Sequence, residues 1–296
     1  MPHFDPDFFR YDGSRPFNIA STDTKIPDIY DTREEYEELL KESAQSLDVL
    51  QSMMYAHNRY GLLVILQALD AAGKDGTIKH VLSGVNPIGL KIHSFKRPTV
   101  TELGHDYMWR SSVLLPERGS ITIFNRSYYE EVLVVKVHPE ILLQTQNLPV
   151  ELTEDLEKVW KNRYKDIRNF EKYLYRNGIR VMKIFLNVSK KEQAERLIER
   201  IQDPSKNWKF EEGDVKERGY WNEYMDAYET CINKTASKQA PWYVVPADDK
   251  KNARLIVGKL IAEELQKMHL SYPKVDDKRS EELQHFIDLI NSQNEE

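Results

Sequence analysis

The chain has a single cysteine and no long hydrophobic run, and each absence excludes a class of protein. With Cys231 alone among 296 residues, an internal disulfide is excluded, and this cysteine lies in no metal-binding or nucleophile pattern. No apolar stretch approaches the roughly 20 residues that a membrane-spanning helix needs. The N-terminus reads MPHFDPDFFRYDG, and its acidic residues and prolines are not typical of a secretory signal. We expect a cytoplasmic protein with no membrane partner.

Zinc-ligand spacing and an even charge distribution are also missing. The eight histidines are dispersed, so no zinc site is predicted. The net charge of −6 gives no reason to expect a nucleic-acid partner. Residues 59–100 nevertheless contain six basic and two acidic side chains, whereas residues 275–296 contain seven acidic and two basic ones. The first segment is therefore locally positive, and the local field decides what binds.

A phosphate loop is predicted inside this positive segment. From Leu62 the chain reads L-L-V-I-L-Q-A-L-D-A-A-G-K-D-G-T, an apolar run followed by a glycine-containing turn. This pattern is typical of a buried parallel strand that leads through a turn into a helix. The turn directs backbone N–H groups inward, and the helix N-terminus adds partial positive charge. We assign phosphate binding to Lys74, as a mobile ammonium, and to Ala71, Ala72, Gly73, Asp75, Gly76 and Thr77.

The loop departs from the usual pattern G-x-x-x-x-G-K-[ST] at two positions. Ala68 stands where the first glycine is expected, and Asp75 stands where the magnesium-binding hydroxyl is expected. Asp70 offers a carboxylate oxygen of the kind that a hard cation beside phosphate prefers, and a helix-capping role is its alternative. The loop therefore predicts phosphate binding with Mg²⁺, or with Mn²⁺ in its place, and argues against ordinary ATP binding.

Strands and helices alternate along the chain, which predicts an α/β fold with a parallel sheet. We expect strands over Leu62–Leu69, Leu90–Phe95, Ser120–Asn125, Val181–Asn187 and Trp242–Val245. Long helices are expected over Thr32–Tyr60, Leu152–Tyr175, Lys190–Ile201 and Lys250–Met268. A capping box at Thr99 and Glu102 predicts a further helix to about Leu115, before Pro116.

The predicted organisation is one catalytic domain with two extensions. Residues 1–45 form an N-terminal helical extension, residues 46–270 the catalytic domain, and residues 271–296 an acidic helical tail. Within the catalytic domain, residues from about 190 to 240 are expected to form a lid.

A second chemical element follows the strand that ends at Asn125. The segment reads I-T-I-F-N-R-S-Y-Y-E from Ile121 to Glu130 and delivers polar residues to the carboxyl edge of the sheet, where ligands of open α/β sheets bind. Asn125 replaces the carboxylate that a P-loop enzyme commonly has there, and a turn-forming role is its alternative. Arg126 is suited to bidentate contact with a phosphate.

A third element is basic and lies between residues 196 and 228. Arg196 and Arg200 are four residues apart and share one face of a helix, and Lys206 follows the break at Pro204. This pattern favours a basic lid, with a solvated surface helix as the alternative. Trp208, Trp221 and Tyr224 are predicted to anchor the module in the core.

Together these segments resemble the polyphosphate kinase 2 family from about Ser46 to Leu265. The motifs that carry the resemblance are A-L-D-A-A-G-K-D-G-T-I, F-N-R-S-Y-Y-E-E-V-L-V, P-S-K-N-W-K-F and A-P-W-Y-V-V-P-A-D-D-K-K-N-A-R-L. The resemblance implies a three-layer P-loop kinase core with a helical lid, assembled as a homodimer or homotetramer. It implies reversible, magnesium-dependent transfer of a terminal phosphoryl group between inorganic polyphosphate and the nucleotides AMP, ADP and ATP.

The resemblance also implies roles for individual residues. Asp70 binds the metal, Lys74 holds the transferred phosphoryl group and Arg126 stabilises its charge. Further phosphate contacts are expected from the lid and from two lysines beside the loop: Arg196, Arg200, Lys206, Lys79 and Lys96.

Asn125 and Glu130 bear on the nucleotide acceptor. Many relatives carry Asp at the position of Asn125, and Asn with a downstream Glu resembles the class III subgroup, which phosphorylates both AMP and ADP. Glu130 offers a second metal contact. Two other functions stay open at this point: an ATP-dependent small-molecule kinase, and a non-enzymatic protein that binds phosphate or nucleotide.

Overall fold

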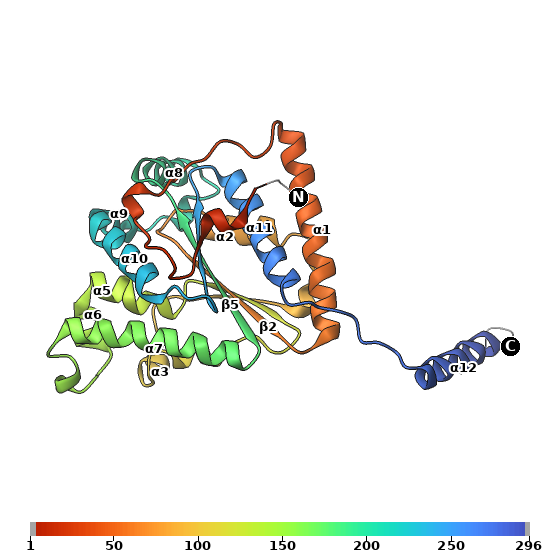
Figure 1. Cartoon of the computed structure of the whole chain (residues 1–296). Coiled ribbons are helices and arrows are strands. Elements are labelled where there is room, and N and C mark those ends of the chain that lie inside the picture. Colours follow the sequence, from red (N-terminus) through yellow and green to blue (C-terminus); the bar gives the residue numbers. More distant parts are fainter. Residues whose placement is uncertain (1–3, 294–296) are drawn as a thin grey trace.

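The computed structural model describes residues 4–293 and has the predicted α/β fold, with helices on both faces of a six-stranded sheet (Figure 1). The strand order is β1-β6-β5-β2-β4-β3. All neighbouring strands are parallel except β1, which is antiparallel to β6. The strands are β1 (Arg10–Tyr11), β2 (Gly61–Gln67), β3 (Leu90–Ser94), β4 (Ile121–Asn125), β5 (Ile179–Asn187) and β6 (Trp242–Pro246).

The central strand β2 explains the layered architecture, because each of its seven residues is buried. Side chains alternate between the two faces of a strand. Leu62, Val64 and Leu66 therefore join one hydrophobic core, and Leu63 and Ile65 join the other. The first core is completed by the helices α1 (Arg33–His57), α2 (Lys74–Val81) and α11 (Lys250–Gln266). The second is completed mainly by α5 (Val134–Val137), α6 (Pro139–Thr145), α7 (Leu156–Arg176) and α10 (Trp221–Thr235).

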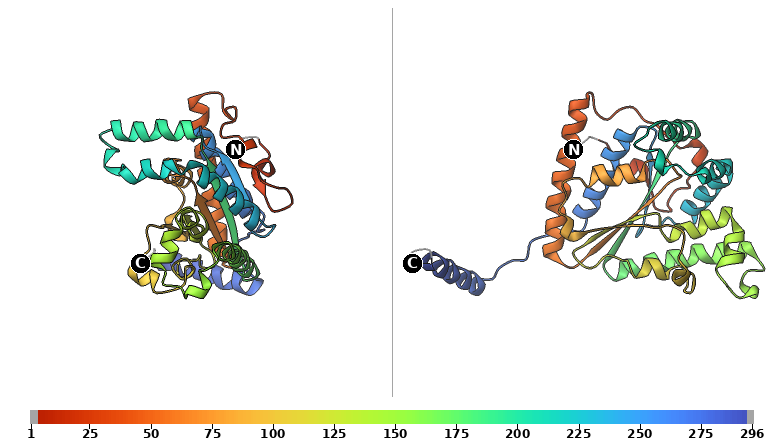
Figure 2. Two further views of the ribbon diagram at one scale, coloured as in Figure 1. Left: turned by 90° about the vertical axis from the view of Figure 1, so that its left-hand side faces the viewer. Right: turned by 180° about the vertical axis from the view of Figure 1, so that it is seen from behind.

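The remaining helices lie at the margins of the core. The helices α8 (Lys190–Gln202) and α9 (Glu212–Gly219) project side by side from the body of the molecule, in teal in Figure 2. The acidic helix α12 (Asp277–Gln293) has no buried residue and stands apart from the other elements at the end of an extended segment (Figure 1). In residues 4–293, no helix combines the length and apolar character that crossing a membrane requires.

The predicted strands are confirmed with ends that shift by at most two residues, and the four long helices are also present. The helix predicted from Thr99 to about Leu115 is wrong. Its capping box forms as expected, but α3 (Val100–Leu103) ends with Gly104 as its C-cap, and a turn at Asp106 precedes the separate helix α4 (Trp109–Ser112). The Asp106 side chain accepts the N–H of Met108 at 2.9 Å, and this local bond competes with a continuous helix.

Two features of the chain termini bear on the predicted organisation. Strand β1 was not predicted, since two residues carry no detectable alternation, and it pairs Arg10 with Tyr243 of β6. Residue 45, the predicted end of the N-terminal extension, lies inside α1, which packs against α11. The outermost parts of the predicted extension and tail, residues 1–3 and 294–296, lie outside the described residues.

Candidate active site

The predicted phosphate loop connects β2 to α2 at the carboxyl edge of the sheet. Ala71 and Gly73 adopt left-handed backbone conformations, with φ of 61° and 105°. A left-handed residue is easily accommodated at Gly73, since glycine has no Cβ, and is uncommon at Ala71. No side chain caps α2, so the N–H groups of its first turn are available to a ligand. The loop therefore has the backbone geometry of an anion site.

Lys74 lies inside this loop rather than in solvent. Its side chain is buried, and Nζ donates to the carbonyl oxygens of Ala68 at 2.8 Å and Leu69 at 3.2 Å. Burial, together with the nearby charge of Arg126, lowers the pKa of Lys74 to about 8, against the opposing effect of the neighbouring carboxylates. A poorly solvated ammonium of this kind gains more than a surface lysine from a phosphate ligand.

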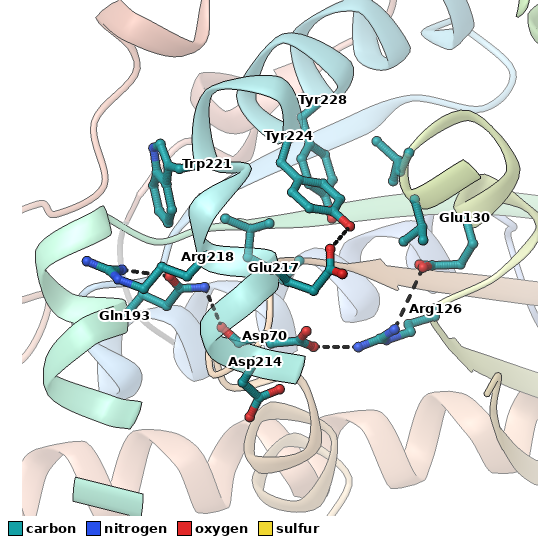
Figure 3. A pocket seen from close by; sticks show the side chains of 14 residues that line it. Asp70, Arg126, Glu130, Gln193, Asp214, Glu217, Arg218, Trp221, Tyr224 and Tyr228 are labelled. Carbon is teal, nitrogen blue, oxygen red and sulfur yellow. Dashed lines mark hydrogen bonds and ion pairs between the residues drawn. The ribbon is translucent and has the colours of Figure 1, made fainter. Parts of the chain in front are cut away.

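Arg126 connects two carboxylates across the edge of the sheet (Figure 3). It follows β4 with a φ of 63°, and Nη2 donates to Oδ1 of Asp70. Nη1 lies 3.8 Å from Oε2 of Glu130. Burial lowers the pKa of Arg126, but Glu130 and Asp70 outweigh this effect and hold the pKa above its usual value. The guanidinium is therefore a fixed positive charge with acidic partners on two sides.

Glu130 is partly buried, and its carboxylate contacts Gln67, the last residue of the central strand β2. Burial raises the pKa of its carboxyl, while Arg126 and Lys74 oppose this shift. With the amide oriented to satisfy its neighbours, Gln67 donates to Oε1 of Glu130 at 3.0 Å and accepts the backbone N–H of Ser127 at 3.2 Å. Gln67 was missed by the sequence reasoning. Its one available signal was a polar residue in an otherwise apolar strand.

Asn125 faces the phosphate loop from β4. Its Nδ2 donates to Oδ1 of Asp75 at 2.7 Å. The opposite amide atom, Oδ1, is buried and has no hydrogen-bond partner among the residues that the structure describes. A carboxylate at position 125 would instead face the Asp75 carboxylate, so the amide removes a repulsion between like charges.

The lid helices α8, α9 and α10 close the opposite side of a pocket over Asp70 (Figure 3). Glu217 on α9 accepts Tyr224 Oη at 2.6 Å and pairs with His138 Nε2 at 2.9 Å. Arg218 donates to Oε1 of Gln193 at 2.8 Å. The pocket is lined by Ala68, Leu69, Asp70, Arg126, Glu130, Leu133, Val134, Gln193, Asp214, Glu217, Arg218, Trp221, Tyr224 and Tyr228. Acidic and aromatic side chains thus face the charged edge of the sheet.

The carboxylates present fit a magnesium ion that is shared with substrate phosphates. No group of three or more His, Cys, Asp or Glu side chains within residues 4–293 is arranged to hold a metal by itself. Mg²⁺ is, however, usually held by one or two carboxylates, by phosphate oxygens and by water. Asp70 supplies one such carboxylate beside the loop, and Glu130 lies across Arg126 from it.

The structure brings six of the predicted residues together around the loop: Asp70, Lys74, Asp75, Asn125, Arg126 and Glu130. Of the basic residues of the third element, Arg196 contacts the loop through the carbonyl of Ala72 at 2.7 Å, whereas Arg200 and Lys206 lie elsewhere. Arg200 pairs with Asp214 at 2.9 Å, and Lys206 is exposed and pairs with Glu199 at 2.8 Å. Lys79 and Lys96 are exposed on α2 and after β3.

The predicted aromatic anchors of the lid divide into three cases. Tyr224 is 6% exposed, so its prediction as a core residue is confirmed. Trp221 is half-buried in the pocket wall. Trp208 is 73% exposed, so its prediction as a core residue is wrong. Its indole N–H donates to the carbonyl of Ser205 at 3.0 Å within the same turn, which orients the ring without burying it.

A phosphate loop after the central strand of a parallel sheet, a buried lysine and a helical lid define a phosphotransferase of the P-loop kinase class. The particular family follows from the whole sequence. The chain belongs to the polyphosphate kinase 2 family, since residues 30–273 match the sequence model described as "Polyphosphate kinase 2 (PPK2)".

Individual relatives support this membership. The chain is 50% identical over 276 residues to the ADP-polyphosphate phosphotransferase of Rhodopseudomonas palustris, covering 93% of this chain and 94% of the relative. It is 43% identical over 228 residues to the AMP/ADP-polyphosphate phosphotransferase of Meiothermus ruber, covering 77% and 80%. The crystal structure of polyphosphate kinase 2 from Arthrobacter aurescens TC1 superposes with a TM-score of 0.85 at 35% identity, covering 97% of this chain and 98% of that one.

Proposed function

We propose that the protein transfers the terminal phosphoryl group of inorganic polyphosphate to ADP, giving ATP, and that AMP is a second acceptor at the same site. The observation that carries the proposal is the assembly of Lys74, Arg126 and Asp70 around an uncapped helix N-terminus. The relatives add support, since one is named for ADP and another for AMP and ADP. The absence of a hydroxyl residue after Lys74 disfavours an ordinary ATP-binding loop.

The reaction needs positioning and charge neutralisation rather than covalent participation by the protein. An oxygen of the acceptor phosphate attacks the terminal phosphorus of polyphosphate, and the bond from that phosphorus to the bridging oxygen breaks. Lys74 and the loop N–H groups hold the phosphoryl oxygens, and Arg126 neutralises charge on the group in transfer. Bound Mg²⁺, or Mn²⁺ in its place, would neutralise further phosphate charge, with Asp70 and Glu130 as its protein ligands.

Residues from about 190 to 240 act as a lid in this proposal. Helix α9 and the start of α10 place Glu217, Arg218 and Trp221 over the pocket, where closure would exclude water from the phosphoryl group. Water is the competing acceptor, so its exclusion favours transfer over hydrolysis. The lid belongs to a catalytic domain over residues 46–270, between the N-terminal extension and the tail.

The direct test is a luciferase assay with polyphosphate and Mg²⁺, with ADP alone or AMP alone and no added ATP. We expect ATP from both acceptors, with ADP as an intermediate when AMP is supplied. ATP from ADP alone would remove AMP from the proposal and keep the rest. No ATP from either acceptor would contradict the proposal and favour an ATP-dependent kinase or a non-enzymatic binder.

The acceptance of AMP is tested at Asn125. Replacing Asn125 with Asp sets a carboxylate against Asp75, where the amide donates a hydrogen bond at 2.7 Å. The added negative charge near the acceptor is expected to lower the AMP-dependent rate about tenfold, which corresponds to about 1.4 kcal/mol in the activation barrier. Initial rates with AMP and with ADP are compared on the same preparation. Full AMP activity in Asn125→Asp would show that the amide at position 125 is not what admits AMP as an acceptor.

A further inference from the structure

Arg196 is buried beneath the phosphate loop, and its contacts differ from those of a phosphate ligand. It lies on α8 and is 6% exposed. Its side chain forms five polar contacts: Nε with Oε1 of Glu192 at 2.7 Å, Nη1 with the carbonyls of Ala72 at 2.7 Å and Ala71 at 3.5 Å, and Nη2 with the carbonyls of Ala247 at 2.6 Å and Asp248 at 3.0 Å. Each of the three guanidinium nitrogens therefore has at least one acceptor within the protein.

These contacts connect the phosphate loop to the turn that follows β6. Ala71 and Gly73 both have positive φ, so the loop adopts a conformation that most sequences avoid. The carbonyl of Ala72 and the N–H of Gly73 belong to one planar peptide unit and point in opposite directions. A hydrogen bond that holds the Ala72 carbonyl toward Arg196 therefore directs the N–H of Gly73 to the other side of the loop, away from Arg196.

A second side chain of α8 binds the peptide unit between Asp70 and Ala71, two units earlier in the loop. Gln193, three residues before Arg196, donates to the carbonyl oxygen of Asp70 at 3.0 Å. Positions three apart lie on one face of a helix. Helix α8 therefore contacts three consecutive carbonyls of the loop, at Asp70, Ala71 and Ala72. Since Arg218 of α9 donates to the same Gln193 side chain, the lid is connected to the loop through α8.

We propose that Arg196 is a positioning residue that fixes the phosphate loop in its anion-binding conformation through its forked hydrogen bonds, rather than a charge that contacts polyphosphate. This inference takes its substrate, polyphosphate, from the proposed function. A lysine in its place keeps the positive charge but is a single point donor and cannot span the two loops as a planar guanidinium does. A role as a positive charge on polyphosphate therefore predicts little change in Arg196→Lys, whereas the positioning role predicts a large loss.

The experiment compares wild type, Arg196→Lys and Arg196→Ala by polyphosphate KM and kcat with saturating ADP. Thermal unfolding is measured in parallel. We expect Arg196→Lys to raise the polyphosphate KM about tenfold or more and to lower kcat, although its charge is retained. Guanidinium ion is expected to restore part of the activity of Arg196→Ala, whereas methylammonium, which has the same charge, is not. Glu192→Gln is the matched control, because it weakens one ion pair and leaves the carbonyl contacts in place; near-wild-type kinetics are expected.

A polyphosphate KM within twofold of wild type in Arg196→Lys would overturn the inference. Titration of tripolyphosphate by calorimetry separates this result from failure of the proposed function. If wild type produced no ATP, the proposed function would fail, but weaker tripolyphosphate binding in Arg196→Lys than in wild type would still support the positioning role. Equal tripolyphosphate binding by the two proteins would exclude it. Arg196→Lys keeps the buried volume filled, so the comparison holds even if Arg196→Ala does not fold.

Discussion

Replacement of Lys74 by methionine is expected to abolish phosphoryl transfer and leave the protein folded. Methionine approximates the length and volume of the lysine stem but removes the ammonium that lies inside the loop. The loss of one charge aimed at the transferred group costs on the order of a hundredfold to a thousandfold in rate. The measurement is ATP formation from polyphosphate and ADP, with circular dichroism as the check on folding.

The same variant is expected to respond differently to pH. The pKa of Lys74 is lowered to about 8 in the folded protein, from 10.5. Between these values the unfolded chain binds more protons, so the contribution of Lys74 to stability rises with pH. Across the whole window this contribution amounts to about 3 kcal/mol. Urea unfolding at pH 7.5 and 9.5 is therefore expected to show wild type gaining stability relative to Lys74→Met.

Two offsetting effects set the stability of this variant at neutral pH. Below pH 8 the buried charge of Lys74 destabilises wild type, whereas the variant leaves the carbonyl of Ala68 without the lysine donor; the carbonyl of Leu69 keeps the N–H of Ala72 at 3.3 Å. An unpaired buried carbonyl costs about 1–3 kcal/mol. Lys41→Met, at an exposed position on α1, is the control and is expected to leave rate and pH response unchanged. A folded Lys74→Met with more than a tenth of wild-type turnover would exclude the proposed role of this lysine.

Asp70→Asn is the second change with a large expected effect. It preserves the shape of the side chain and removes the negative charge that pairs with Arg126 and that would bind Mg²⁺ beside the phosphates. We expect turnover to fall about a thousandfold, since both the metal position and the orientation of Arg126 depend on this carboxylate. Rates are measured over a series of Mg²⁺ concentrations, to test whether excess metal restores activity.

The control for Asp70→Asn is Glu117→Gln, which removes a carboxylate of an exposed ion pair with Lys91. An exposed pair of this kind contributes little to stability, about 0–1 kcal/mol, and it lies outside the pocket. Its turnover is therefore expected to equal that of wild type. Metal-dependent turnover at the wild-type rate in a folded Asp70→Asn protein would refute Asp70 as the metal ligand.

Local patterns in the sequence were sufficient for the core of the site. The apolar run before Asp70, the turn at Gly73 and the polar residues after Phe124 each indicated a strand end. Parallel strands align their carboxyl ends at one edge, so strand type alone placed the loop at the same edge as Asn125 and Arg126, whereas the strand order that makes them neighbours came from the structure. The structure has this arrangement, with β2 and β4 as neighbours in parallel register.

Patterns of residue type were insufficient to predict the contacts of long side chains. The spacing of Arg196 and Arg200 correctly placed both on one helix face, but the guanidinium of Arg196 reaches into the protein and that of Arg200 reaches Asp214. Helical periodicity fixes the direction of Cβ and not the position of atoms several bonds further on. Likewise, Trp208 has a large aromatic side chain of the kind that is usually buried, yet it is 73% exposed, because no neighbouring element covers it in this arrangement of the lid.

The sequence by itself determined the fold class, the phosphate loop and the family, because each depends on short segments whose residue types restrict backbone conformation and burial. Only the tertiary structure decided which charges face the pocket and which are satisfied within the protein. Three basic residues of the predicted phosphate set illustrate this. Lys74 lies inside the loop, Arg196 binds the carbonyl oxygen of Ala72 from α8, and Lys206 pairs with Glu199. These three environments differ because the carbonyl partners of Arg196 are distant in the chain, whereas the partners of Lys74 and Lys206 are local. Hydrogen-bond geometry decides which of the available acceptors each side chain binds.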